Sequence, residues 1–542
     1  MAKVVSSQLK VGLEIHIELA TRSKMFARAP SPGHRDFEGA GPNSLIDPTV
    51  LGLPGALPVL NREAIEMSMR VGVALGCAIA PLTRWDRKSY FYPDMPKNYQ
   101  ISQYQLPLCF DGSVELPGIG RDGNGNPEFD FSLPGKSIGI IRAHLEEDAG
   151  KLLHEAPGGT AIDGSIVDLN RAGTPLLEIV TQPDFSNADE VVVFAQMLRT
   201  LCRFLGVTQG VMQKGHMRFE PNINMVLTLE DGRLVTTPIV EVKNLNSFKA
   251  LRGAIESEQD EQPRRWEETG AVFGPGSKST RGWEEAPGSR HGGRTVLQRE
   301  KEDAHDYRYF PDPDLLPVRV GREWVEAARA ATPELPVSRM KRYMRDYAIA
   351  AKEAAALVEE RADCEYFEAT IRRAIERGVE SDRAGKQAAN FVLQSGAKRA
   401  NERAAADADL SGAGGARLVS HLGVSPDQLA GIIHMRETGS LGSNQADTLF
   451  GVLTDAGMSG ADPAAVAAER GLLVLRDDAA LGRWCEQAIE ENPKAAEDVR
   501  AGKDAAIGRL VGAVMKLSAG RADASAAREA LRDLIKRVNG AG

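Results

Sequence analysis

The chain has 542 residues, with 66 Lys or Arg and 75 Asp or Glu, which gives a formal net charge of −9 at pH 7. The length allows about three or four domains, and the acidic balance excludes a protein that coats nucleic acid through a global basic field. Its 5 cysteines, without a C-x-x-C pair, support neither a disulfide framework nor a zinc ribbon. Without a signal-peptide pattern or a long apolar run, we expect a cytoplasmic protein with no membrane contact.

The first predicted strand offers three candidate ligands on one face. Residues 12–19 read GLEIHIEL, so Glu14, His16 and Glu18 alternate with apolar residues and should lie on the opposite face from them. The same alternation is typical of a half-solvated strand in any antiparallel sheet. This segment alone therefore favours an ordinary strand.

Two candidate loops follow. Residues 86–103 (DRKSYFYPDMPKNYQISQ) are dense in Tyr, Lys and Asp around two prolines, which suits either a structured aromatic loop or a positioned binding loop. Residues 118–123 match G-x-G-x-x-G by letters, but they lead into NGNP (124–127) and not into a helix. We therefore expect a plain turn there, and the chain has no Walker A motif.

Three further predicted strands carry polar side chains at alternate positions. They cover residues 138–148, 175–180 and 216–225. Their polar members include Arg142, His144 and Glu146, then Glu178, then Arg218 and Glu220. In the first of these strands, Ile141, Ala143 and Leu145 should point the other way. Glu178 interrupts an apolar strand, and a buried carboxylate needs a cation or a metal nearby.

These residue types suit phosphoryl transfer. Carboxylates with one or two imidazoles are appropriate ligands for Mg²⁺, which is commonly shared with phosphates. Arg142, Arg218 and Lys243 would offset the phosphate charge. The pattern predicts a metal-dependent site but does not show that the four polar faces converge.

The remaining elements predict the organisation of the chain. Helices are expected at 187–206 and 244–262, and the Gly-rich, charged residues 267–295 should form a mobile surface loop. Residues 1–330 would form an antiparallel-sheet α+β catalytic domain. The spacing of the rest predicts a helical domain at 331–405, a linker at 406–416 and a small helical tail domain at 417–542.

The motifs together resemble a known family. The segments that carry the resemblance are GLEIHIEL (12–19), LGLPGALPVLN (51–61), DRKSYFYPDMPKNYQISQ (86–103), HLEEDAGK (144–151), VDLNRAGTPLLEIV (167–180), VKNLNSF (242–248) and DYRYFPDPDLLPV (306–318). They are similar, in this order, to the B subunits of bacterial-type aspartyl/glutamyl-tRNA(Asn/Gln) amidotransferases, the GatB family. The similarity continues in the tail through LVGAVMK (510–516).

This resemblance implies a carbon–nitrogen ligase with glutamine as amide donor. Such a protein would use ATP and Mg²⁺ to phosphorylate the side-chain carboxylate of Glu-tRNA(Gln) or Asp-tRNA(Asn). Ammonia from an amidase subunit (GatA) would then displace phosphate to give Gln-tRNA(Gln) or Asn-tRNA(Asn), and a small subunit (GatC) would complete a heterotrimer. The sequence leaves open which tRNA is served and where the ammonia travels.

The resemblance also implies roles for single residues. His16, Glu146 and Glu178 match the family's metal-binding positions, and Glu147 is the alternative to Glu146, although strand parity favours Glu146. The expected catalytic residues are Glu14, Glu146 and Lys88, of which Lys88 resembles a residue near the ammonia entry. The expected phosphate-binding or substrate-binding residues are Arg142, Arg218, Glu220 and Lys243.

Basic residues of the tail are candidates for tRNA binding. Residues 494–537 contain ten Lys or Arg against six Asp or Glu, which makes a local basic patch on an acidic protein. The candidates are Lys503, Arg509, Lys516 and Arg521. Two other functions stay open: a tRNA-binding scaffold without catalysis, which would not need the inward polar positions, and an archaeal-type relative, for whose extra insertion the spacing leaves little room.

The sequence departs from the family in places. Glu220 stands where relatives usually have Asp, which lengthens the carboxylate by one methylene, and residues 442–445 lack a lysine that relatives often have. Where many relatives carry C-P-x-C, this chain reads DPTV (47–50). Since structural zinc needs about four Cys or His ligands, we expect none. Apolar contacts should hold this region instead, through Leu51, Leu53, Leu57 and Val59.

Purified protein should therefore contain no stoichiometric zinc, because residues 47–50 supply no pair of thiolates. Elemental analysis checks the metal content, and a thermal melt with and without a zinc-selective chelator should give one melting temperature. One tightly held zinc per chain would contradict this prediction.

Overall fold

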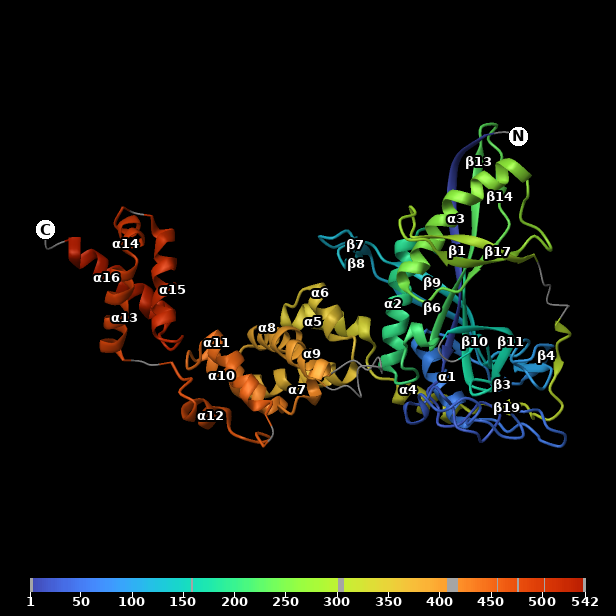
Figure 1. Ribbon diagram of the computed structural model, residues 1–542, viewed down its shortest axis with the longest axis horizontal. Helices are drawn as coiled ribbons and strands as arrows, with labels where there is room; N and C mark the ends of the chain where they lie inside the picture. Colours follow the sequence, from blue (N-terminus) through green and yellow to red (C-terminus); the bar gives the residue numbers. More distant parts are fainter. Residues whose placement is uncertain are drawn as a thin grey trace. The chain divides into compact units, whose positions relative to one another are not determined.

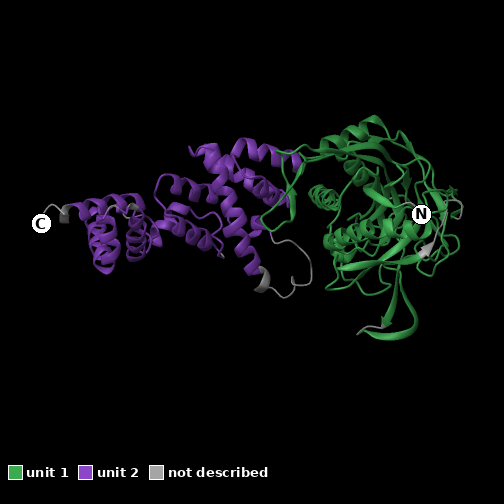
Figure 2. Cartoon of the chain, turned by 90° about the horizontal axis from the view of Figure 1, so that it is seen from above, with its two compact units in different colours: residues 1–336 green, residues 337–542 purple. Residues whose placement is uncertain are grey.

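The chain forms two compact units, residues 1–336 and 337–542 (Figure 2). The structure is a computed structural model that describes residues 3–156, 159–300, 307–406, 418–455, 457–474, 477–501 and 503–539. The first unit is rich in strands and the second is helical (Figure 1), which confirms the predicted α+β character at this level. The finer division of the chain stays a prediction, and residues 407–416 of its linker lie outside the described residues.

A 13-stranded sheet forms the centre of the first unit. Its strands, in spatial order, are β17 (Gly293–Glu300), β16 (Ser279–Glu285), β15 (Val240–Lys243), β13 (Met217–Leu229), β1 (Val4–Glu18), β12 (Pro175–Thr181), β9 (Lys136–Glu147), β5 (Tyr99–Ser102), β4 (Asp86–Ser89) and β18 (Phe310–Pro311). Beside this path, β14 (Leu234–Thr236) pairs with β13, and β6 (Cys109–Leu116) pairs with β9 and with β2 (Ala78–Ile79). Among the described pairings of this sheet, β15 with β16 is the parallel one, and the others are antiparallel.

Three smaller strand pairs accompany the sheet. They are β3 (Leu82–Thr83) with β19 (Val318–Arg319), β7 (Ile119–Arg121) with β8 (Pro127–Phe129), and β10 (Lys151–Ala156) with β11 (Thr160–Asp168). The β7–β8 hairpin contains the G-x-G-x-x-G letters, and Asp122 Oδ1 accepts backbone hydrogen bonds across its turn from Asn124 and Asn126. The predicted plain turn is therefore confirmed.

Helices cover the apolar face of the central strands. Those of the first unit are α1 (Arg62–Ala74), α2 (Ala188–Phe204), α3 (Phe248–Thr269) and α4 (Arg322–Ala331). Leu13, Ile15 and Ile17 of β1 are at most 1% exposed. On the neighbouring strand, Phe219 meets Phe248 of α3 with ring centroids 6.0 Å apart, and α3 contacts both β1 and β13. With one face buried in this way, the polar face of the same strands is left to form a site.

Both predicted helices of this unit are confirmed as α2 and α3, and a side chain caps the start of each. Asn187 accepts a hydrogen bond from the backbone N–H of Glu190 at the start of α2, and Ser247 accepts one from Ala250 at the start of α3. Such side chains satisfy amide groups that the first helical turn leaves unpaired. The second helix extends to Thr269, beyond its predicted end.

One predicted orientation in β9 is wrong. Ile141 was expected on the apolar face but is 40% exposed, whereas Ile140 is 2% exposed. The pairing with β12 shifts between Arg142 and Ile140, so a β-bulge inserts one residue there and reverses the alternation before it. Ala143 and Leu145, after the bulge, are fully buried as predicted.

The prediction of a mobile loop at 267–295 is also wrong. Residues 279–285 and 293–300 form β16 and β17, which extend the central sheet. Thr280 and Trp283 of β16 are both buried. The surrounding glycines and charges hide both strands in the sequence, and β17, as the edge of the sheet, tolerates polar residues on its solvent side.

The apolar contacts expected in residues 40–60 are made mainly by other residues than predicted, and of the four predicted residues only Leu51 is partly buried. Leu53, Leu57 and Val59 are 48 to 61% exposed, so they do not hold this region. Val50 is buried instead and packs with Ala29 and Ala172. Asp47 Oδ1 accepts a hydrogen bond from the Val50 N–H at 2.9 Å, so residues 47–50 form a turn that directs the valine inward.

The second unit is helical throughout its described elements, apart from short turns. Its helices are α5 (Pro336–Tyr347), α6 (Ala351–Leu357), α7 (Arg361–Glu376), α8 (Ser381–Asn390), α9 (Ala397–Ala406), α10 (Pro426–Glu437), α11 (Ser443–Leu453), α12 (Pro463–Glu469), α13 (Asp478–Glu491), α14 (Pro493–Arg500), α15 (Ile507–Leu517) and α16 (Ala524–Asn539). Helix α10 packs on α7, and helices α13 to α16 share a core that includes Leu510, Val514 and Leu531.

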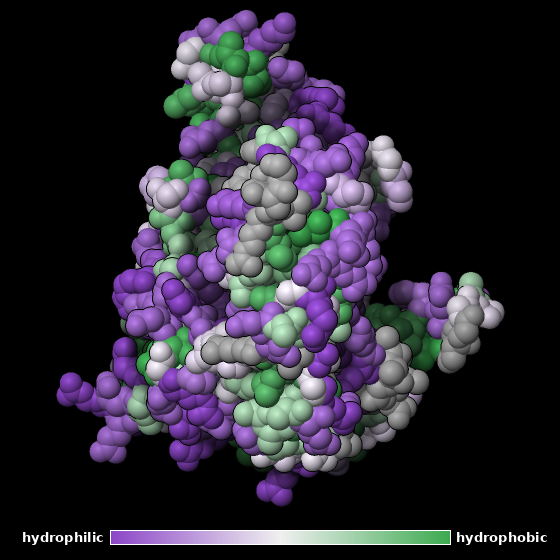
Figure 3. Space-filling model, turned by 90° about the vertical axis from the view of Figure 1, so that its left-hand side faces the viewer, coloured by the Kyte–Doolittle hydropathy of each residue, from purple (hydrophilic) through white to green (hydrophobic). Residues whose placement is uncertain are grey.

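The face of the molecule shown in Figure 3 is mainly polar: hydrophilic residues predominate and apolar ones gather in small patches. Within the described residues, no helix has the length and apolar character needed to span a membrane.

Candidate active site

Four adjacent strands place polar side chains in one row across the sheet. His16 of β1 is paired with Glu178 of β12 on one side and with Arg218 of β13 on the other. Glu178 is in turn paired with His144 of β9. Directly paired residues share a face and lie about 5 Å apart. The predicted polar faces therefore converge, and the strand register is the cause.

Three carboxylates surround one nitrogen of His16. Its Nε2 lies 3.5 Å from Glu178 Oε2 and 3.7 Å from Glu146 Oε1. Glu14 Oε1 lies 3.9 Å from the same nitrogen, and Glu220 Oε1 lies 4.0 Å from Nδ1 on the other side of the ring. We call these five residues the His16 cluster.

Burial and the charge of Glu178 hinder the ionisation of two acids of the His16 cluster, Glu14 and Glu146. Burial, followed by the charge of Glu178, raises the pKa of Glu14 to about 7 and raises the pKa of Glu146. Burial disfavours a charged His16, but its hydrogen bond with Glu178 and the charge of Glu220 raise the pKa of the ring to about 9. The pKa of Glu178 falls well below its ordinary range, because His144 and His16 outweigh the effect of burial.

This donor set suits a divalent cation. Carboxylate oxygens with one imidazole are the ligands expected for Mg²⁺ shared with phosphates, and the ligand atoms of His16, Glu146 and Glu178 all lie within 4.8 Å of one another. The same holds for Glu14, His16 and Glu220. A cation at Nε2 would replace the ring proton and offset the negative charge that burial makes costly.

Glu146 and Glu147 point to different sides of β9. Ser102 Oγ donates a hydrogen bond to Glu146 Oε2 at 3.0 Å within the His16 cluster. Glu147 instead accepts hydrogen bonds from Lys97 Nζ and from the backbone N–H of Ile101. The geometry therefore agrees with the parity argument for Glu146.

A cavity of about 1010 Å³ lies over the His16 cluster. Acids of the cluster, four basic residues and six aromatic residues line it. The basic residues are Lys88, Arg142, Lys243 and Lys278. The aromatic residues are Tyr90, Phe91, Tyr92, Tyr104, Tyr307 and Tyr309. Acids for a metal and cations for an anionic substrate thus share one space.

Two lysines extend the polar row towards β16. Lys243 Nζ lies 2.9 Å from Glu220 Oε2 and 2.8 Å from Glu241 Oε1. Lys278 Nζ lies 2.7 Å from Glu241 Oε2. Burial raises the pKa of Glu241, but the two lysines together lower it to about 2. The sequence analysis missed Lys278, because only the pairing of β16 with β15 brings it to the cavity.

Comparison with known proteins identifies the family. The profile described as GatB/GatE catalytic domain matches residues 9–326, and the profile described as GatB domain matches residues 365–535. The chain belongs to the GatB family. The resemblance predicted from the motifs is confirmed, and with it the class of glutamine-dependent aminoacyl-tRNA amidotransferase subunits.

Similar GatB proteins match this chain over nearly its whole length. The B subunit of the aspartyl/glutamyl-tRNA(Asn/Gln) amidotransferase of Thermomicrobium roseum is 40% identical over 530 residues, which cover 97% of this chain and 98% of the relative. The corresponding B subunits of Rhodopirellula baltica and Ralstonia nicotianae are each 39% identical, cover 97% of this chain, and are themselves covered to 97% and 98%.

Four of the candidate residues are not part of the cavity lining: His16 and Glu220, which belong to the cluster beneath it, and Arg218 and Glu18. Arg218 Nη2 donates a hydrogen bond to Asp148 Oδ2 at 3.1 Å. Glu18 is buried near this pair, and burial with the charge of Asp148 raises its pKa to about 7. The structure thus ties Arg218 to Asp148, and its predicted contact with phosphate stays a prediction. The four tail candidates belong to the second unit.

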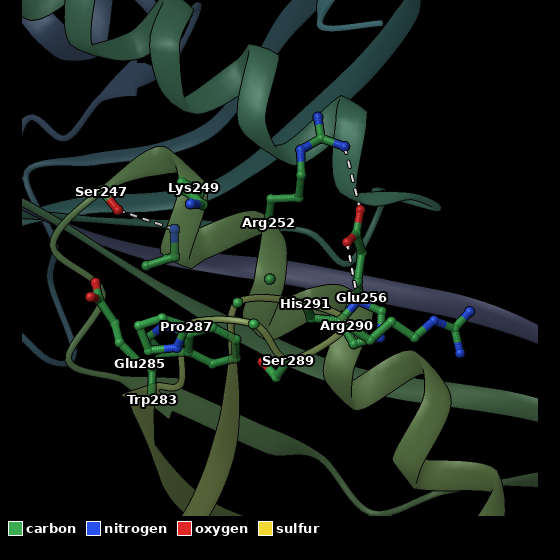
Figure 4. A pocket seen from close by; sticks show the side chains of 14 residues that line it. Ser247, Lys249, Arg252, Glu256, Trp283, Glu285, Pro287, Ser289, Arg290 and His291 are labelled. Atoms are coloured by element: carbon green, nitrogen blue, oxygen red, sulfur yellow. Dashed lines mark hydrogen bonds and ion pairs between the residues drawn. The ribbon is translucent and has the colours of Figure 1, made fainter.

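A second cavity, of about 610 Å³, lacks such a set of converging groups. It lies between the start of α3 and the turn that joins β16 to β17 (Figure 4). Its charged residues compensate one another: Arg252 contacts Glu256 at 3.4 Å, and His291 Nδ1 lies 3.3 Å from the same carboxylate. The cavity over the His16 cluster is therefore the candidate active site of this GatB protein.

Glu178→Gln should weaken the binding of Mn²⁺, a spectroscopic substitute for Mg²⁺, by at least about tenfold, because the metal loses an anionic oxygen. Electron paramagnetic resonance of free Mn²⁺ during titration measures the affinity. Glu115→Gln, which changes an exposed carboxylate of β6, should bind Mn²⁺ as the parent does. Equal affinity in the Glu178 variant would place the metal elsewhere.

Proposed function

We propose that this chain uses ATP and Mg²⁺ to activate the side-chain carboxylate of Glu-tRNA(Gln) or Asp-tRNA(Asn) and then transfers ammonia to it. The observation that carries the proposal is the convergence of three carboxylates, none of them fully exposed, on His16 Nε2, beneath a cavity that also holds four cations. A scaffold that only binds tRNA has no need for buried like charges, which are costly to maintain.

The reaction needs a leaving group on a carboxylate. A carboxylate oxygen of the substrate attacks the γ-phosphorus of ATP, ADP leaves, and an acyl phosphate remains. Ammonia then attacks the acyl carbon, the bond to the phosphate oxygen breaks, and one proton is lost to give the amide. Mg²⁺ supplies charge stabilisation on the transferred phosphoryl group.

The proposal assigns roles by position. His16, Glu146 and Glu178 would hold the metal, and Ser102 fixes Glu146 through its hydrogen bond. Glu14, whose Oε1 lies 3.9 Å from His16 Nε2, would lie beside the metal as a catalytic candidate. These five side chains come from three adjacent strands and the neighbouring β5, so the sheet itself fixes their spacing.

The basic residues form two groups in the lining of the same cavity. Lys243 and Lys278, held by Glu241, bind the phosphates on the side of β15 and β16. Arg142 lies over the ring of Tyr104, with 5.9 Å to its centroid, and Lys88 lies over Tyr307 at 4.6 Å. We place the arriving ammonia on the side of Lys88.

The relatives are named as the B component of an amidotransferase, which implies a multi-subunit enzyme that acts on tRNA. We infer that an amidase subunit (GatA) releases ammonia from glutamine and that a small subunit (GatC) completes the heterotrimer.

The assembled enzyme should convert misacylated tRNA in the presence of ATP, Mg²⁺ and glutamine. Incubation with Glu-tRNA(Gln) and with Asp-tRNA(Asn), followed by identification of the amino acid released from each tRNA, shows the substrate. His16→Ala should lower amidation by at least about a hundredfold, because the metal ligand is lost, while glutamine hydrolysis by the amidase persists. Amidation at the parental rate would place the site elsewhere. Absence of tRNA-dependent ATP hydrolysis in the parent would favour the scaffold.

We further propose that the basic tail residues bind tRNA. Arg509 and Lys516 are exposed on α15 and seven residues apart, so they share one face. Arg521 is partly buried, and Lys503 Nζ lies 3.0 Å from Asp498 Oδ1. The α15 pair therefore offers the most accessible charge.

Reversing both charges in the Arg509→Glu, Lys516→Glu variant should weaken tRNA binding and reduce the slope of log affinity against log salt by about one for each lost phosphate contact. Filter binding at several salt concentrations measures both quantities. Lys352→Glu, which reverses an exposed charge on α6, serves as control. An unchanged slope in the double variant would remove this assignment.

A further inference from the structure

The candidate cavity carries aromatic side chains that phosphoryl transfer and amide formation do not require. Two of them, Phe91 and Tyr92, are 71% and 59% exposed although they line a cavity dominated by charges. Large aromatic rings gain most from burial against a partner. Their exposure beside the site points to a ligand that covers them.

The segment that presents these rings is anchored without any ligand. It joins β4 to β5, and its backbone is closed by hydrogen bonds from Tyr90 N to Asn98 O and from Met95 N to Tyr92 O, both of 3.0 Å. Met95 is 2% exposed, and Lys97 forms a buried ion pair with Glu147. A platform held in place beforehand loses little conformational entropy when it binds.

Further rings connect this platform with the His16 cluster. Tyr92 stacks on Tyr90 with centroids 5.2 Å apart, and Tyr104 stacks on Tyr309 with centroids 4.4 Å apart. Tyr104 and Tyr309 line the same cavity as the proposed metal ligands Glu146 and Glu178, whose charges help, after burial, to raise the pKa of Tyr309. Aromatic surface therefore extends from the exposed rim to the site of reaction.

We propose that Phe91 and Tyr92 form a stacking platform for the unpaired 3′-terminal nucleotides of the aminoacyl-tRNA. This inference rests on the proposed function, which requires the aminoacyl group at the end of that single strand to reach the His16 cluster. Single-stranded nucleotides bind by stacking bases on aromatic rings while cations follow the backbone. Lys88 and Arg142 line the same cavity and supply such charge.

The adenine of ATP offers the same stacking chemistry, so the experiment must separate the two sources. In the assembled enzyme, the Phe91→Ala, Tyr92→Ala variant should raise the KM for misacylated tRNA about tenfold or more. The KM values for ATP and glutamine should stay unchanged. Phe91→Trp should retain the parental KM for tRNA, because it preserves a stacking surface. Phe273→Ala, which removes a ring of 56% exposure outside the cavity lining, serves as matched control.

A double-mutant cycle that combines the protein variant with a shortened, uncharged tRNA tests the contact directly. Removal of the 3′-terminal adenosine should weaken binding to the parent but should leave binding to the double Ala variant unchanged. The inference would be overturned if removal of the adenosine and the double Ala substitution weakened binding independently, so that their losses of binding free energy added. A rise in the KM for ATP alone would also overturn it. Failure of the proposed function looks different, since the parent would then amidate no misacylated tRNA while the double-mutant cycle still reports on the platform.

Discussion

The structure of the first unit is organised around negative charge that the protein concentrates and then restrains. Glu14, Glu146 and Glu178 converge on one nitrogen of His16 in a largely buried site. Like charges brought together where water is largely excluded are costly. The neighbouring groups limit that cost: Ser102 donates to Glu146, and His144 lies 3.4 Å from Glu178. A divalent cation can offset the negative charge that these groups leave uncompensated. The arrangement that opposes folding therefore favours the binding of a metal.

The geometry of the site follows from the two-residue period of strands and from their register. Each central strand buries one side-chain row against helices, and this forces the alternate row to the other face. A slip of one residue in β1 would exchange Ile15 for His16 and would bury the imidazole in the apolar core. The burial of Leu13, Ile15 and Ile17 therefore fixes the ligand positions as firmly as any contact among the ligands. The same apolar contacts therefore stabilise the fold and set the geometry of the site.

The sequence predicted those parts of the site that depend on local period. The alternation in β1 and the lone carboxylate in β12 are visible in single segments, and so is the choice of Glu146 over Glu147 when strand parity is applied. Ile141 was assigned wrongly because a bulge in β9 changes the parity, and a bulge depends on pairing with two neighbours. Lys278 was missed because its place depends on the parallel contact of β16 with β15, which joins segments separated by the whole of α3. Local patterns thus predict which side chains share a face, whereas pairing partners decide which faces meet.

Glu220 shows what a glutamate, as opposed to the shorter aspartate, reaches at this position. The tautomer of His16 that leaves Nε2 available to a metal carries its proton on Nδ1, and a carboxylate that faces this nitrogen stabilises the arrangement. Glu220 Oε1 faces it at 4.0 Å, while Oε2 of the same group pairs with Lys243 at 2.9 Å. The first distance is too long for a hydrogen bond, so Glu220 acts on the ring through its charge, in agreement with its contribution to the raised pKa of His16. An Asp at the same backbone position would be shorter by one methylene and could not place its two oxygens on both partners with the present backbone. The longer side chain thereby couples the imidazole to Lys243, and through Glu241 to Lys278, so that the metal side and the cationic side of the cavity belong to one connected network.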